Sequence, residues 1–141
     1  MLPLLCREFI VNVPQQIAWH RLTRVEQWPE WAKHIKKIVV EPAGELGPDS
    51  VGVIHLTNGV KSTFRVVEFN PYRNWKWEGP FLWLTVHYDH IFQPENAEAT
   101  RLIWKVEGSG FGVSLFGRIF AAFYKRDLDR AVQRLVATIR E

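Results

Sequence analysis

Between Ile35 and Gly108, strand-like segments follow one another with only short turns between them. Asn58-Gly59 is a strong hairpin signal, and Asn70-Pro71 and Pro94-Glu95-Asn96 mark two further turns. Strands joined by such short turns run antiparallel, because a parallel crossover needs about a dozen residues or more. The sequence therefore predicts an antiparallel sheet, one face of which another element must cover.

Helical patterns lie on either side of these strands. Apolar residues at helical spacing predict a short helix from Pro14 to about Glu26. Trp28-Pro29-Glu30-Trp31 interrupts it, and a second short helix follows through about His34. With Ser114 as N-cap, the segment from Leu115 onward predicts a helix of roughly 25 residues. The predicted strands are 8–13, 35–41, 51–57, 60–69, 72–78 (closed by Gly79-Pro80), 82–92 and 99–108.

These elements predict one α+β domain over residues 1–141. A curved antiparallel sheet of about seven strands would wrap around a long C-terminal helix, with two short helices after the first strand. The length suits one domain, and 47% apolar with 23% charged residues argues against disorder.

Composition narrows the functional classes. The single cysteine, Cys6, excludes an intramolecular disulfide and favours a reducing cytoplasm. No stretch approaches the ~18 consecutive apolar residues of a membrane span, so no stable membrane insertion is expected. The net charge of +3 is only mildly basic, and the positive charges of the last helix are interleaved with acids. A solvated helix face explains this better than nucleic-acid binding.

Aromatic residues are unusually abundant, with seven Trp, nine Phe and three Tyr. A small domain does not close-pack so many large rings easily, which points to a lined cavity, with a bulky core as the alternative. Strand alternation and the first half of the last helix, with Phe116, Ile119, Phe120, Phe123 and Tyr124, define the inward face. The predicted ligand-binding wall is Trp75, Trp77, Val86, Tyr88, His90, Trp104, Phe116, Phe120 and Tyr124.

Few groups suit catalysis. His87 and His90 lie on opposite faces of their strand and cannot share a metal ion, so no metal site is expected. His90 and Tyr88, both inward, are the candidates for proton transfer, although a hydrogen-bonded core histidine is the favoured interpretation. Asp127 is either a buried acid or, by preference, the partner of Arg126 or Arg130.

Two further motifs are set aside. One interpretation of Arg65 is a side chain that points inward toward a ligand carboxylate, but outward exposure is the default for arginine. Gly108-Ser-Gly110-Phe-Gly112 lacks both the third glycine and the parallel βαβ unit of a dinucleotide loop. No nucleotide or other cofactor is expected, and nothing supports a nucleophilic serine or cysteine.

A set of ordered motifs resembles a known family. They are Phe9-Ile-Val-Asn-Val-Pro14, Ala18-Trp19, Trp28-Pro29-Glu30-Trp31, Phe92-Gln-Pro94, Thr100-Arg101-Leu102 and the long terminal helix. In order and spacing they resemble the SRPBCC superfamily, which includes START domains, the birch-pollen-allergen fold and polyketide cyclase/dehydrase proteins. The resemblance implies a helix-grip fold with a deep hydrophobic cavity between sheet and terminal helix. It carries over no catalytic residue, because the superfamily shares none.

Three functional hypotheses follow. The first is binding or carriage of a hydrophobic small molecule, such as a lipid, sterol or polyketide-like compound. The second is a polyketide aromatase/cyclase or dehydratase, with His90 and Tyr88 handling protons. The third is a protein-interaction module that uses the basic terminal helix. The sequence favours the first, because the inward face is poor in titratable groups.

Overall fold

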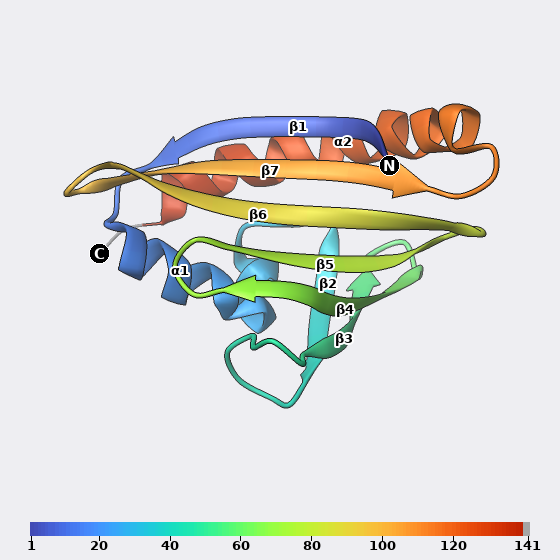
Figure 1. Ribbon diagram of the computed structural model, residues 1–141. Helices are drawn as coiled ribbons and strands as arrows, with labels where there is room; N and C mark the ends of the chain where they lie inside the picture. The colour runs from blue at the N-terminus through green and yellow to red at the C-terminus, as the bar shows by residue number, and fades with distance from the viewer. Residues whose placement is uncertain (140–141) are drawn as a thin grey trace.

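The strands form one curved antiparallel sheet in the computed structural model, which describes residues 1–139 (Figure 1). Its order is β1-β7-β6-β5-β4-β3-β2, so consecutive strands are neighbours except where β1 joins β7. The predicted α+β architecture is confirmed. The strands are β1 (Leu2–Val11), β2 (Ile35–Glu41), β3 (Val51–Leu56), β4 (Lys61–Asn70), β5 (Asn74–Phe81), β6 (Leu84–Asn96) and β7 (Ala99–Ser109).

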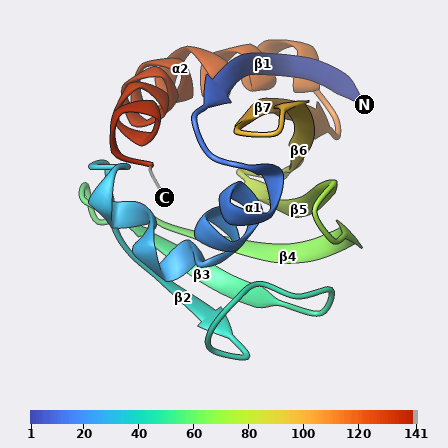
Figure 2. The same cartoon turned by 90° about the vertical axis from the view of Figure 1, so that its left-hand side faces the viewer.

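The helices cover the concave side of this sheet. Figure 2 shows the sheet curling round, with the long helix α2 (Val113–Thr138) beside β1 and β7. The helix α1 (Gln15–Thr23) and the 3₁₀ helix η1 (Val25–Glu30) lie across one end. No helix within the described residues is long and apolar enough to span a membrane.

The two halves of α2 pack differently. In the C-terminal half, Leu128, Ala131 and Leu135 are buried against the rest of the core. In the N-terminal half, only Gly117 is buried, where its missing side chain lets α2 approach Leu4 of β1. The tightly packed half therefore holds α2 on the sheet, and the other half is covered less completely.

The short helical region differs from the prediction. Trp28-Pro29 does not interrupt it, because Pro29 lies inside η1. A 3₁₀ turn uses i→i+3 hydrogen bonds, here from Gln27 N to the Arg24 carbonyl, and Pro29 costs it only one donor. The two predicted short helices are present as α1 and η1, but the bounds of the second are wrong: η1 ends at Glu30 rather than near His34, and a turn leads into β2.

Other predicted boundaries also move. The predicted turn Pro94-Glu95-Asn96 lies within β6, because Pro94 and Asn96 pair with β7. β1 begins at Leu2 rather than Glu8, because Leu2 to Val11 pair with β7 although their sequence hardly alternates. Gly79-Pro80 do not close β5 but pair with β6, and the turn lies at Leu82, where φ is +56°. The N-cap of α2 is Gly112 at φ +76°, not Ser114, because a glycine adopts this left-handed geometry without strain.

Candidate functional site

The inner face of the sheet carries a cluster of buried aromatic rings. Trp75 and Trp77 come from β5, His90 from β6 and Trp104 from β7. All four are buried, Trp75 completely, so their predicted inward direction is confirmed. Trp104 is also approached by Phe9 of β1, at 5.0 Å between ring centroids. The cluster thus joins four neighbouring strands of the sheet.

Two tryptophans that the sequence analysis did not place in this wall complete the cluster. Trp28 and Trp31 of the η1 region are buried, and both rings pack on Trp104, at 6.1 and 6.0 Å. A spacing of three residues puts two side chains on the same side of a 3₁₀ helix. The pair Trp28 and Trp31 was therefore a usable signal, which the interpretation of Trp28-Pro29-Glu30-Trp31 as a helix interruption concealed.

His90 occupies the middle of the cluster. Its ring stacks on Trp75 at 4.3 Å, and the rings of Trp77 and Trp104 meet it edge-on at 4.9 and 5.8 Å. Its Nδ1 lies 3.2 Å from the Trp75 carbonyl oxygen. A carbonyl only accepts, so Nδ1 carries the proton and Nε2 keeps a lone pair. Burial lowers the pKa of His90 to about 3, which leaves the imidazole neutral at ordinary pH.

Two indole N–H groups in the wall have no acceptor. Nε1 of Trp75 and Nε1 of Trp104 are buried without a hydrogen-bond partner among the described residues. Trp28, by contrast, donates from Nε1 to the Leu22 carbonyl at 2.9 Å. A buried unpaired donor costs about 1–3 kcal/mol, so two of them on one apolar wall call for a cause.

A second aromatic group lies where α2 faces β5 and β6. Phe120 is 5.0 Å from Phe81, 6.4 Å from Tyr88 and 5.3 Å from Tyr124, between ring centroids. Burial raises the pKa of Tyr88 far above its ordinary range and that of Tyr124 to about 12. Both phenols therefore stay protonated and are able to donate a hydrogen bond.

The predicted wall residues thus separate into groups. Trp75, Trp77, His90 and Trp104 belong to the buried cluster, whereas Tyr88, Phe120 and Tyr124 form the half-buried group. Val86, also buried, lies two residues before Tyr88 on the same face of β6. Phe116 lies at the outer edge, 4.8 Å from Trp83.

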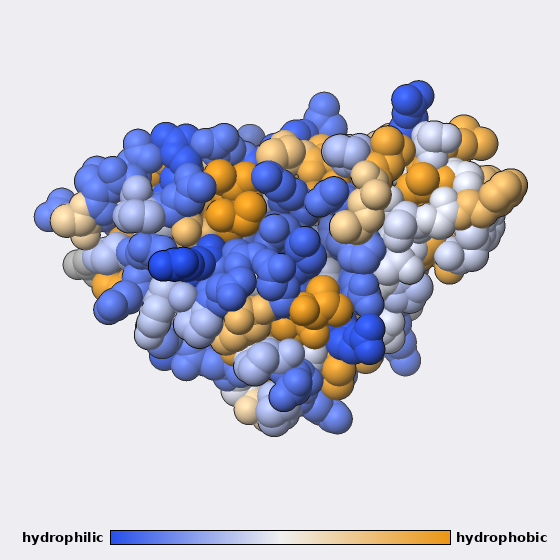
Figure 3. Space-filling model, in the orientation of Figure 1, coloured by the Kyte–Doolittle hydropathy of each residue, from blue (hydrophilic) through white to orange (hydrophobic). Residues whose placement is uncertain are grey.

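The inward prediction for Ile119 and Phe123 is wrong. Ile119 is exposed, and Phe123 is 79% exposed. Residues 116, 120 and 124 recur every fourth position and turn one side of α2 inward, which rotates residues 119 and 123 toward solvent. Figure 3 shows hydrophobic colours toward the right-hand end of the molecule, where α2 begins.

A cavity of about 270 Å³ opens between α2 and the region around β2 and β3. Asp127 lines it but forms no ion pair with Arg126 or Arg130 within residues 1–139, contrary to the favoured expectation. The Asp127 carboxylate instead affects His34. Burial lowers the pKa of His34, and the negative charge of Asp127 partly opposes this shift. The other lining residues are Lys33, His34, Thr57, Arg130, Ala131 and Arg134.

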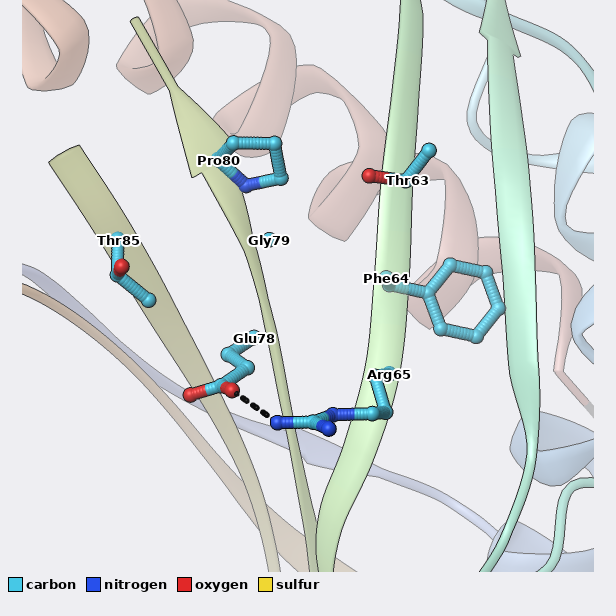
Figure 4. Close-up of a pocket in the computed structure, with 7 residues that line it drawn as sticks. All are labelled: Thr63, Phe64, Arg65, Glu78, Gly79, Pro80 and Thr85. Atoms are coloured by element: carbon cyan, nitrogen blue, oxygen red, sulfur yellow. Dashed lines mark hydrogen bonds and ion pairs between the residues drawn. The ribbon is translucent and has the colours of Figure 1, made fainter. Parts of the chain in front are cut away.

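The larger groove, about 390 Å³, lies beside β4, β5 and β6, and Figure 4 shows its lining. Arg65 is exposed and pairs with Glu78 at 2.9 Å, as its outward default predicts. Phe64 points the other way and packs on Trp77 at 4.2 Å. The outward side chains of the groove are therefore separated by the sheet from the aromatic cluster. The remaining lining residues are Thr63, Gly79, Pro80 and Thr85.

The polar neighbours of the cluster bear on catalysis. Asp89 faces away from His90 and accepts a hydrogen bond from the Asn74 amide at 2.9 Å. His87 also faces outward, 3.4 Å from the Glu78 carboxylate, so the two histidines lie on opposite faces as expected. The orienting partner of His90 is therefore a backbone carbonyl and not a carboxylate.

Similar folds occur in solved structures of low sequence identity. A hypothetical protein of Helicobacter pylori, jhp0584, superimposes with a TM-score of 0.78 at 15% identity, over 96% of this chain and 86% of its own. The Zhui aromatase/cyclase of Streptomyces sp. R1128 gives 0.70 at 14% identity, over 94% and 90%. Ginseng major latex-like protein 151 of Panax ginseng gives 0.69 at 11% identity, over 94% of each chain.

Comparison with curated proteins gave no match. The model of one protein family, described as polyketide cyclase / dehydrase and lipid transport, matches residues 6–140, which is nearly the whole chain. The sheet order, the position of α2 and this match agree with one another. The chain therefore belongs to the polyketide cyclase/dehydrase and lipid-transport family, within the SRPBCC superfamily of helix-grip proteins.

Proposed function

We propose that the protein binds and carries a hydrophobic small molecule, such as a lipid, a sterol or a polyketide-like compound, between the sheet and α2. The observation that carries this proposal is the pair of buried indole N–H groups of Trp75 and Trp104, which lack a partner within residues 1–139, in a largely apolar wall. Small-molecule sites are typically apolar surfaces with a few polar groups that fix orientation.

The polar atoms of the wall indicate the kind of ligand. Trp75 and Trp104 offer donors, which suit a carbonyl, ether or hydroxyl oxygen. The unprotonated Nε2 of His90 offers an acceptor, which suits a hydroxyl. None of these groups is charged near neutral pH, because the pKa of His90 is about 3. The expected ligand is therefore apolar over most of its surface, uncharged where it meets the cluster, and oxygenated at one end.

The packing of α2 suggests where such a ligand enters. Phe116, Phe120 and Tyr124 are only half-buried, whereas Leu128 and Leu135 further along the helix are buried. Displacing half-buried side chains costs less apolar burial than displacing buried ones. Movement of the first half of α2 and its rings is therefore the cheapest way to admit a ligand between helix and sheet.

Dye binding and native mass spectrometry test this proposal. An environment-sensitive apolar dye should bind at about one site and quench tryptophan emission, because Trp75, Trp77 and Trp104 lie within one cluster. Protein released gently from the cells that produced it should carry a co-purified oxygenated apolar compound. Failure to bind any fatty acid, sterol or aromatic polyketide in a broad screen would overturn the carrier proposal.

The alternative is a polyketide aromatase/cyclase or dehydratase reaction in the same space, with His90 and Tyr88 handling protons. The family includes cyclases, and Nε2 of His90 has a free lone pair. Two observations disfavour it: a pKa of about 3 makes His90 a weak base, and no carboxylate orients it. If the alternative holds, His90→Gln abolishes turnover but spares ligand affinity. If His90 is only a wall residue, the substitution changes affinity or stability alone.

A further inference from the structure

One end of the molecule exposes a group of large apolar side chains on two neighbouring elements. Phe111, in the loop before α2, is 89% exposed, and Phe123 on α2 is 79% exposed. Single exposed apolar residues are common, but a contiguous exposed group marks an interaction site. We call this group the apolar end; it consists of Leu82, Trp83, Phe111, Leu115, Ile119 and Phe123.

The apolar end is held in place by specific contacts. Trp83, in the β5–β6 turn, donates from Nε1 to the Phe111 carbonyl at 2.7 Å and packs edge-on against Phe116 at 4.8 Å. Leu115, Ile119 and Phe123 follow at intervals of four residues and therefore form one stripe on α2. Turn, loop and helix thus come together at one end of the molecule, where Figure 3 shows orange and tan atoms among white ones.

The exposed charges along this surface are basic, whereas Asp127, the next position of the α2 stripe after Phe123, lines the cavity between α2 and the β2–β3 region. Residues 79–86 carry no charged side chain, and residues 108–126 carry Arg118, Lys125 and Arg126 but no acidic residue. All three basic side chains are exposed. At 100° per residue, Arg118 and Lys125 lie on the flank of the apolar stripe that is turned away from Phe116 and Phe120. The stripe is therefore bordered by positive charge on one side and by the half-buried aromatic group on the other.

This combination fits an anionic lipid surface better than a second copy of the chain. Aromatic side chains and a basic border are typical of helices that lie in the membrane interface. A two-fold symmetric dimer that pairs α2 antiparallel through the same face would bring Arg118 and Lys125 of one copy beside those of the other, which like-charge repulsion disfavours. The chain also contains no spanning helix within residues 1–139, so the contact is peripheral.

We propose that the apolar end docks reversibly on a membrane that contains anionic lipids. Trp83, Phe111 and Phe123 enter the boundary between headgroups and acyl chains, while the basic side chains meet the lipid phosphates. The half of α2 that carries Phe120 and Tyr124 would then face the bilayer. Docking itself stands independently of ligand binding, because it uses different residues from the buried cluster.

Vesicle flotation tests the proposal. The wild-type protein should float with vesicles of phosphatidylcholine and phosphatidylserine, float poorly with phosphatidylcholine alone, and lose binding as salt rises. The double variant Phe111→Ser/Phe123→Ser should lower the partition coefficient about tenfold or more. The triple variant Arg118→Gln/Lys125→Gln/Arg126→Gln should lower it on the order of 100-fold, since each basic residue near an anionic surface contributes roughly fivefold.

Matched variants on other faces provide the controls. Val39→Ser/Val67→Ser removes two exposed apolar residues from β2 and β4, and Lys36→Gln/Lys37→Gln/Lys61→Gln removes three exposed charges. Both should float like wild type, with dye binding and thermal unfolding unchanged in every variant. The proposal is overturned if wild type does not float with anionic vesicles or if the controls lose as much binding. It is equally overturned if sedimentation shows a dimer that Phe111→Ser/Phe123→Ser dissociates while vesicle binding is absent.

Discussion

His90 contacts Trp75 in two ways. The two rings stack at 4.3 Å with 15° between their planes, and His90 Nδ1 donates a hydrogen bond to the Trp75 carbonyl at 3.2 Å. The two residues are direct partners across β5 and β6. One tautomer of a neutral imidazole is therefore held flat against an indole whose own N–H has no acceptor in the part of the chain that the structure describes. This arrangement orients His90 without giving it the charge partner of a general base.

The buried neutral His90 predicts how stability depends on pH. Its pKa is about 3 in the folded state and about 6.5 when unfolded. As pH falls from about 6.5 to about 3, the unfolded chain takes up a proton that the folded chain does not, and stability falls by up to about 1.4 kcal/mol per pH unit. Denaturant unfolding across this range should show that slope in wild type and a flatter one in His90→Gln. Equal slopes in both proteins would mean that His90 is protonated in the folded state.

His34 offers the matched comparison for this experiment. Burial lowers the pKa of His34 too, but the nearby Asp127 carboxylate opposes the shift. His34→Gln should therefore change the slope between pH about 6.5 and about 3 less than His90→Gln does. A larger change of slope in His34→Gln than in His90→Gln would show that water reaches His90 in the buried cluster more than its packing indicates.

The unpaired indole of Trp104 predicts an asymmetry between two tryptophan substitutions. Trp104→Phe and Trp28→Phe remove the same atoms, but only Trp28 donates a hydrogen bond, to the Leu22 carbonyl. Trp28→Phe should cost about 0.5–1.5 kcal/mol more in unfolding free energy, the usual net value of such a bond.

For ligand binding the order of the two substitutions should be reversed, with Trp104→Phe weakening binding more than Trp28→Phe does. Trp104→Phe should weaken binding of an oxygenated apolar ligand and leave its deoxygenated hydrocarbon analogue almost unaffected, measured by isothermal titration calorimetry. A loss of the same size for both ligands would mean that Trp104 contributes only surface and that its N–H plays no part.

The sheet has no room for a side chain at Gly79. A Cβ at Gly79 would collide with the backbone carbonyl oxygen of Thr63 on the neighbouring strand. Gly79→Ala should therefore cost about 1–3 kcal/mol or more in denaturant unfolding, because a strand cannot yield as a side chain does. Gly47→Ala is the control, since its Cβ would meet only Ser50 Oγ at 3.9 Å, an ordinary contact. A neutral Gly79→Ala would show that β4 and β5 separate easily.

The sequence by itself determined the antiparallel sheet, the long terminal helix and the faces of the strands. These follow from local chemistry: the Asn58-Gly59 turn, the alternation of Trp75 and Trp77 with polar neighbours, and a helix without proline. The faces of the strands also follow from the alternation of side chains along a strand. Once one residue is known to face inward, the directions of the others on that strand are fixed. The inward position of His90 and the outward position of His87 were predictable for this reason.

Tertiary structure decided what depends on partners distant in the chain. β1 extends to Leu2 because β7 pairs with it, and the β5–β6 turn falls at Leu82 because pairing carries Gly79-Pro80 into the sheet. Whether an indole N–H has an acceptor is likewise invisible in sequence, since Trp28 has one at Leu22 and Trp104 has none among the described residues. The exposure of Ile119 and Phe123 was decided by which side of α2 the curved sheet covers, because a helix with apolar residues on more than one side buries only the side that meets a partner.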